Sequence, residues 1–151
     1  MPGDDHNADV HVAGTNPVNG TRNGVIEGPW DTADNGDESC AIWQHVRLAN
    51  SASGSTVIDC SANNTYQPRN ADGGLIGIQS AANFTNPTGL RGAYVMCSDA
   101  ILGRLATQLD ATLDDGVGNT GALRVAVRGA TASAGVAVPL EGSTYVVCMS
   151  F

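Results

Sequence analysis

Three carboxylates near the end of an expected helix are the first candidates for chemistry. The stretch QLDATLDDGVGNTG, residues 108–121, holds Asp110, Asp114 and Asp115 and then runs into glycines. Close carboxylates serve in acid–base catalysis, in calcium binding, or in fixing a turn through hydrogen bonds from loop N–H groups. A calcium ion takes about six to eight oxygen ligands. Asp110, Asp114, Asp115 and Asn119, together with loop carbonyls, would supply such a set.

Sequence context ranks these three chemistries. The spacing does not match an EF-hand, so calcium stays as the alternative interpretation. Paired-carboxylate catalysis on sugars needs aromatic stacking platforms, and this stretch has no neighbouring Trp or Tyr. We therefore expect first that these carboxylates fix the turn through hydrogen bonds, and second, as the alternative, that they bind calcium. We set catalysis aside.

The histidines offer weaker candidates. Zinc uses residue types such as those of the N-terminal segment, but their spacing matches no ligand motif, and we interpret this segment as a solvated acidic arm. It holds Asp4, Asp5, His6, Asp9 and His11. His45 has no Ser or Cys nucleophile beside it, so we expect a core histidine that is bonded to a backbone carbonyl.

The charged residues narrow the function classes further. All seven basic residues are Arg, which removes a phosphate-loop lysine and a Schiff-base lysine. Residues 1–38 carry eight acidic residues against Arg22, a net charge of −7 out of the total −8. An acidic arm repels phosphate, so we expect no nucleic-acid partner. With no nucleophile, zinc-protease or phosphate motif present, we also expect no enzyme and no cofactor apart from the calcium alternative.

Four widely spaced cysteines indicate an oxidising compartment. Cys40, Cys60, Cys97 and Cys148 form no C-x-x-C motif, which disfavours a zinc ribbon. The segments AYVMC and TYVVC resemble each other and end at Cys97 and Cys148, so neighbouring strands would place these two thiols together. Four cysteines allow three pairings, and we prefer Cys40–Cys60 with Cys97–Cys148. Four buried free thiols are the alternative.

Hydrophobic periodicity predicts an α+β fold with two helices and an antiparallel sheet of about four strands. A first helix is expected over 38–50 with Asp37 as its N-cap. A second helix is expected over 98–114, capped by Ser98 or Asp99, with an apolar stripe formed by Ile101, Leu102, Leu105, Leu109 and Leu113. The expected strands lie within 73–80, 92–97, 122–129 and 143–150, with short ones in 24–28 and 56–60. We expect one domain, 1–151, made of an acidic polar loop region, 1–37, and an α+β core, 38–151.

Several segments together resemble a known family. PGD (2–4), ESCAIWQHVRLAN (38–50), PRNADGGLIGI (68–78), QLDATLDDGVGNTGALRV (108–125) and YVVCMSF (145–151) resemble, in this order, the globular domain of type IV pilin-like or minor pilin-like (pseudopilin-like) proteins of bacteria. The resemblance implies an antiparallel sheet that packs on a long N-terminal hydrophobic helix, which this sequence lacks. That helix would be a removed segment or a separate chain, and a membrane would be reached only through it.

The resemblance implies a structural subunit of an extracellular pilus-like filament or of a periplasmic pseudopilus. Its partners would be other pilin subunits in a homo-oligomeric filament. The alternative is a secreted adhesin or sugar-binding module, which Trp30 and Tyr66 exposed side by side would favour; a metal-dependent hydrolase is a third hypothesis. A sheet that leaves an apolar groove unfilled in the absence of a helix would support the filament subunit, and a sheet fully covered on both faces by its own chain would contradict it.

Overall fold

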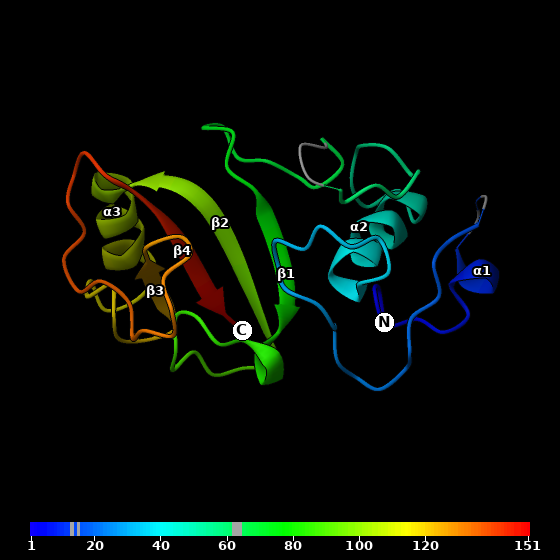
Figure 1. The fold of residues 1–151 in the computed structure, drawn as a ribbon, viewed down its shortest axis with the longest axis horizontal. Coiled ribbons are helices and arrows are strands. Elements are labelled where there is room, and N and C mark those ends of the chain that lie inside the picture. The colour runs from blue at the N-terminus through cyan, green and yellow to red at the C-terminus, as the bar shows by residue number, and fades with distance from the viewer. Residues whose placement is uncertain (13, 15, 62–64) are drawn as a thin grey trace.

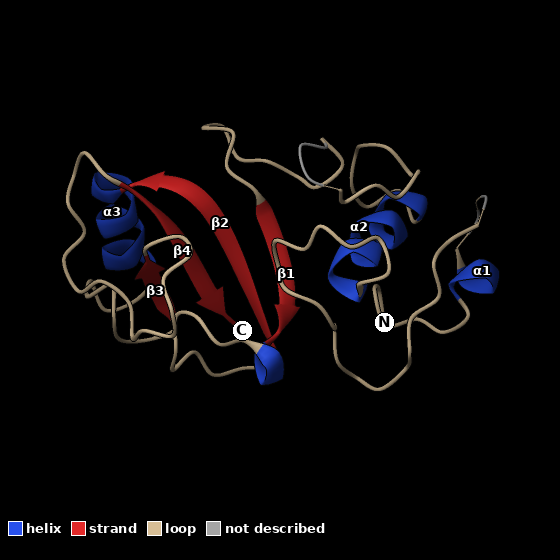
Figure 2. Cartoon of the chain, viewed as in Figure 1, coloured by secondary structure: helices blue, strands red, loops and turns tan. Residues whose placement is uncertain are grey.

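The computed structural model describes residues 1–12, 14, 16–61 and 65–151 and shows an α+β fold. As the sequence predicts, the fold contains a four-stranded antiparallel sheet, and its strand order is β1-β2-β4-β3 (Figures 1 and 2). The strands are β1 Ile76–Ser80, β2 Tyr94–Leu102, β3 Leu123–Ala126 and β4 Thr144–Ser150. The helices are α1 Ala8–His11, α2 Glu38–Leu48 and α3 Gly103–Leu113, with a 3-10 turn η1 Ala81–Asn83.

Both expected disulfides are present. Cys97 and Cys148 lie directly opposite each other on β2 and β4 and are bonded, with a Cα–Cα distance of 4.1 Å. Cys40 on α2 is bonded to Cys60 in the loop that follows. The first disulfide therefore joins the two central strands, and the second ties α2 to its own loop. Two disulfides fit a protein that folds in an oxidising compartment.

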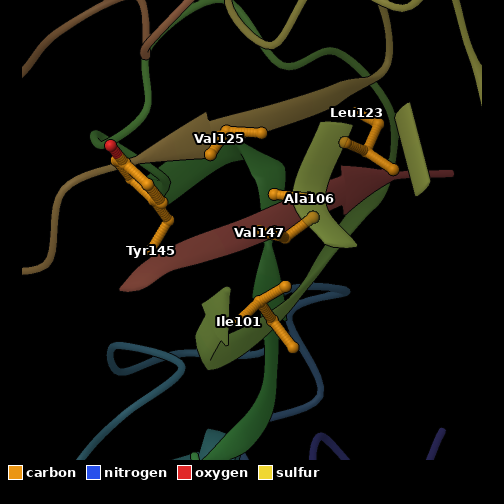
Figure 3. Packing of buried hydrophobic residues seen from close by; sticks show 6 residues of the cluster. All are labelled: Ile101, Ala106, Leu123, Val125, Tyr145 and Val147. Atoms are coloured by element: carbon orange, nitrogen blue, oxygen red, sulfur yellow. The ribbon is translucent and has the colours of Figure 1, made fainter. Parts of the chain in front are cut away.

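The two faces of the sheet are covered differently. On one face, the chain's own loops cover the side chains around the central disulfide, in a cluster of Trp30, Val95, Cys97, Val146 and Cys148 with Phe84 and Leu90 beside it. On the other face, α3 packs over β3 and β4 (Figure 3). That second cluster contains Ile101, Ala106, Leu123, Val125, Tyr145 and Val147.

The second helix begins later than predicted. Strand β2 runs through Leu102, so Ser98 and Asp99 belong to a strand and do not cap a helix. The pairing of β2 with β4 shifts register between Ser98 and Ile101, where Ala100 has a φ of 56°. This bulge lets Ile101 keep its pairing with Tyr145. The apolar residues at 101 and 102 thus extend a strand, and a helical period alone does not reveal this.

The acidic N-terminal region is not a free arm. It includes α1, which the sequence did not predict, and it packs against α2 through buried polar groups. The buried Glu38 carboxylate accepts hydrogen bonds from the N–H groups of Thr21 and Glu27. The Asp4 carboxylate accepts hydrogen bonds from two further backbone N–H groups, those of residues 23 and 24. Loop segments stay ordered here because carboxylates satisfy their backbone donors.

The two expected short strands are not formed, because the described residues of 24–28 and 56–60 lie in loops. Strand β3 is shorter than the expected range 122–129, since it ends at Ala126. Ala126 is buried and Arg124 is half-buried under loops, while Val127, which follows the strand, is exposed.

Candidate functional site

The acidic cluster lies where α3 turns into the loop that leads to β3. One carboxylate oxygen from each of Asp110, Asp114 and Asp115 lies within 4.8 Å of the others. Helix α3 ends at Leu113, and Gly116 adopts a φ of 80°, which suits a turn that reverses the chain. The sequence therefore placed both the end of the helix and the cluster correctly.

Hydrogen bonds from the loop hold these carboxylates. Asp114 Oδ2 accepts the Leu123 N–H at 2.8 Å, at the first residue of β3. Asp115 Oδ1 accepts the Val117 N–H at 2.9 Å, and its Oδ2 accepts the Thr120 hydroxyl at 2.6 Å. The Thr120 hydroxyl and then the Val117 N–H lower the pKa of Asp115. Asp114 and Asp115 therefore fix the turn through hydrogen bonds, as the sequence predicts.

Asp110 differs from its neighbours. Its side chain is 1 % exposed, and its Oδ1 accepts the Gly116 N–H at 2.9 Å. Its Oδ2 is buried without a hydrogen-bond partner among the described residues. Burial raises the pKa of Asp110, and the nearby Asp115 and Asp114 charges raise it further. Asn119, the fourth expected ligand, is half-buried in the loop beyond the cluster.

The histidines have structural roles in the described residues. His45 Nδ1 accepts the Gly3 N–H at 2.9 Å, and its Nε2 lies 2.7 Å from the Val18 carbonyl oxygen. The buried ring thus joins two N-terminal segments to α2, and the prediction of a core histidine bonded to a carbonyl is correct. His11 pairs with Asp5 at 2.7 Å, and this hydrogen bond lowers the pKa of Asp5.

A pocket of about 450 Å³ lies beside Trp30, with Phe84, Gln79 and Arg128 among its lining residues. The Arg128 guanidinium lies over the Trp30 ring and pairs with the carboxylates of Asp31 and Asp99. Its charge is therefore neutralised within the chain. Trp30 and Tyr66 are 8 % and 3 % exposed, so the joint exposure that would favour a sugar-binding surface is absent.

The most exposed apolar surface of the sheet lies on the face that carries α3. Met96 and Met149 lie directly opposite each other on β2 and β4 and are 41 % and 36 % exposed. Tyr94 and Phe151 exchange two backbone hydrogen bonds at the end of the same pair, and their ring centroids are 6.1 Å apart. Because side chains alternate along a strand, these residues share a face with Tyr145 and Val147, which α3 covers. We call Tyr94, Met96, Met149 and Phe151 the open sheet face.

A second exposed apolar feature borders this face. Leu105, Leu109 and Leu113 recur at four-residue steps along α3 and are 38 %, 38 % and 54 % exposed. The sequence predicted an apolar stripe through these three residues, but Ala106 and Asp110 occupy the buried side of the helix. We call these three residues the leucine stripe. Its side chains form one flank of α3.

The chain has no match among protein-family models, curated proteins or solved structures. Among the described residues, no helix combines the length and apolar character needed to cross a membrane. Three structural features therefore bear on the function of the chain: the open sheet face, the leucine stripe and the acidic cluster.

Proposed function

We propose that this chain is a structural subunit of an extracellular pilus-like filament and acts through contacts rather than chemistry. The observation that carries the proposal is the open sheet face, which the described chain leaves exposed although the opposite face of the sheet is covered. The occupant we assign to this face is an apolar helix, as the resemblance to pilin-like domains implies. The helix would hold the domain in the filament.

The residues of the open sheet face suit such an occupant. Its four side chains are large and uncharged, and they stand in two directly paired rows on β2 and β4. Fully burying one large apolar side chain contributes about 1.5–3 kcal/mol, and because these side chains are already partly covered, an interface would gain a part of that amount from each. Contiguous exposed apolar surface on a folded domain commonly marks a contact site.

The leucine stripe lies along one side of the open sheet face. Helix α3 connects β2 to β3, which run parallel with β4 between them. Connections between parallel strands are right-handed in nearly all proteins. With Ala106 turned toward the sheet, a right-handed connection directs the leucine stripe toward β2. A helix lying on Met96 and Met149 would then touch the stripe along its side.

The start of the described chain lies at the same place. The Met1 sulfur accepts a hydrogen bond from the Tyr94 hydroxyl, at the edge of the open sheet face. Met1 itself is 45 % exposed. A helix joined to the N-terminus would therefore reach the open sheet face without a long linker, and this is the arrangement that we propose.

Filament incorporation tests this function. Met96→Glu and Met149→Glu place a charge on the open sheet face, and each should abolish recovery of the chain in filaments sheared from cells of its source organism. Val138→Glu is the matched control, because Val138 is 79 % exposed and lies outside both features. The proposal fails if all three variants enter filaments as the unmodified chain does, or if the unmodified chain enters none.

A further inference from the structure

In the acidic cluster at the end of α3, three carboxylates lie close together, and hydrogen bonds alone do not balance their negative charge. Asp110 lies in the last turn of α3 and Asp114 directly follows the helix, and their carboxylate oxygens lie within 4.8 Å of each other, so their like charges repel. Both lie at the C-terminal end of the helix, where the helix dipole disfavours anions. Asp115 adds a third carboxylate within the same 4.8 Å group.

The burial and hydrogen bonding of the Asp110 side chain indicate that a positively charged partner is missing. It is 1 % exposed, yet its Oδ2 has no hydrogen-bond partner in the part of the chain that the structure describes. A buried carboxylate oxygen without a partner loses its hydration and gains nothing in return. The described salt bridges involve His11 and Arg128 and none of the three cluster carboxylates. The Arg124 charge helps to lower the pKa of Asp115, but among the described residues no basic side chain forms a salt bridge with any of the three carboxylates.

We propose that Asp110, Asp114 and Asp115 bind a calcium ion. The group consists of oxygen donors, which a hard cation prefers, and contains no His or Cys that would favour zinc. The carboxylates are already oriented, because loop N–H groups bind one oxygen each of Asp110 and Asp114 and leave the other oxygen available. Asp115 is exposed, so water can complete the roughly six to eight ligands that calcium takes.

The ion would lock the junction between α3 and β3. Leu123, where β3 begins, is bonded to Asp114, and the Asp110 carboxylate holds Gly116. A cation bound to both carboxylates would fasten the end of the helix to the start of the strand. This inference rests on the cluster alone and does not depend on filament assembly.

Calcium titration of the isolated chain by calorimetry, together with thermal melting, tests the proposal. After dialysis against EGTA, calcium at about 100 times its Kd should raise the Tm by roughly 5 °C or more. Magnesium at the same concentration should raise it less, because magnesium demands a stricter geometry. Asp110→Asn should lower calcium affinity at least about tenfold and remove the rise in Tm.

Two further variants keep the test decisive if Asp110→Asn folds poorly. Asp115→Asn alters an exposed carboxylate and should also weaken calcium binding, whereas the exposed Asp72→Asn should bind calcium as the unmodified chain does. Asp110→Asn should also melt at or above the unmodified chain in EGTA, because the unpartnered charge is gone. No calcium binding by the unmodified chain, or equal binding by Asp115→Asn, would overturn the proposal.

Discussion

Met96 and Met149 face each other across β2 and β4, on the side of the sheet where α3 packs, and both remain exposed. The neighbouring pair, Cys97 after Met96 and Cys148 before Met149, forms a buried disulfide on the opposite side. The same strand pair is thus covered on one side, whereas on the other side α3 covers Tyr145 and Val147 and leaves Met96 and Met149 exposed. This asymmetry underlies the proposed helix contact.

The leucine stripe should contribute little to the stability of the isolated domain. Leu113 is 54 % exposed, so Leu113→Gln should change the free energy of unfolding by less than about 1 kcal/mol. Leu123 is 2 % exposed, so Leu123→Ala should cost about 2–5 kcal/mol. Urea unfolding of both variants provides the comparison. Similar costs would show that the chain itself buries the stripe.

Features that local sequence patterns determine could be predicted, whereas features that depend on contacts between distant segments could not. Asp37 takes the N-cap position of α2 as local helix rules predict, although its carboxylate accepts the Thr32 hydroxyl and makes no capping hydrogen bond. Asn50, which follows the helix, adopts a φ of 56°. The leucine stripe has an equally regular pattern, but it lies beside the buried face of α3. A pattern shows that a face is apolar without showing whether this chain or another covers it.

In the N-terminal region, by contrast, the sequence has no regular pattern from which the structure could be predicted. Its polar composition predicted a loop region with a solvated acidic arm at its start, but carboxylates such as those of Asp4 and Glu38 are buried and bind backbone N–H groups about 17 to 20 residues away in the sequence. Such bonds leave no periodic signal. The acidic cluster was visible because its residues are neighbours in the sequence, whereas the unpartnered oxygen of Asp110 required the structure.

His45 should act as an anchor for the N-terminal segments. His45→Ala removes the partners of the Gly3 N–H and the Val18 carbonyl, which should cost about 2–4 kcal/mol in the free energy of unfolding. Amide exchange at Gly3 should also become faster. His11→Ala is the control, since His11 is exposed and its change should stay within about 0.5 kcal/mol. Equal stability of the two variants would contradict the anchoring role.

Tyr66 should make the fold sensitive to alkaline pH. Burial raises the pKa of Tyr66 to about 12, although the Arg47 guanidinium, 4.6 Å from the ring centroid, opposes this. The unfolded chain has a tyrosine pKa of about 10, so the neutral ring stabilises the fold fully below pH 10. That contribution, about 2–3 kcal/mol, is lost as the pH rises from about 10 through 12.

Absorbance of tyrosinate and unfolding at each pH check this prediction. One tyrosine of the folded chain should ionise near pH 12, and Tyr66→Phe should remove that step and reduce the alkaline loss of stability. Tyr94→Phe is the matched control, because Tyr94 is only half-buried. If all tyrosines ionise together near pH 10 while the chain stays folded, Tyr66 is not shielded as described.

The most direct test of the central claim is a density map, by electron cryomicroscopy, of filaments sheared from cells that produce this chain. The account predicts repeating copies of the domain, each with a helical rod of density packed on Met96 and Met149 and bordered by Leu105, Leu109 and Leu113. A filament in which solvent covers this face, or cells whose filaments lack the chain, would contradict the account.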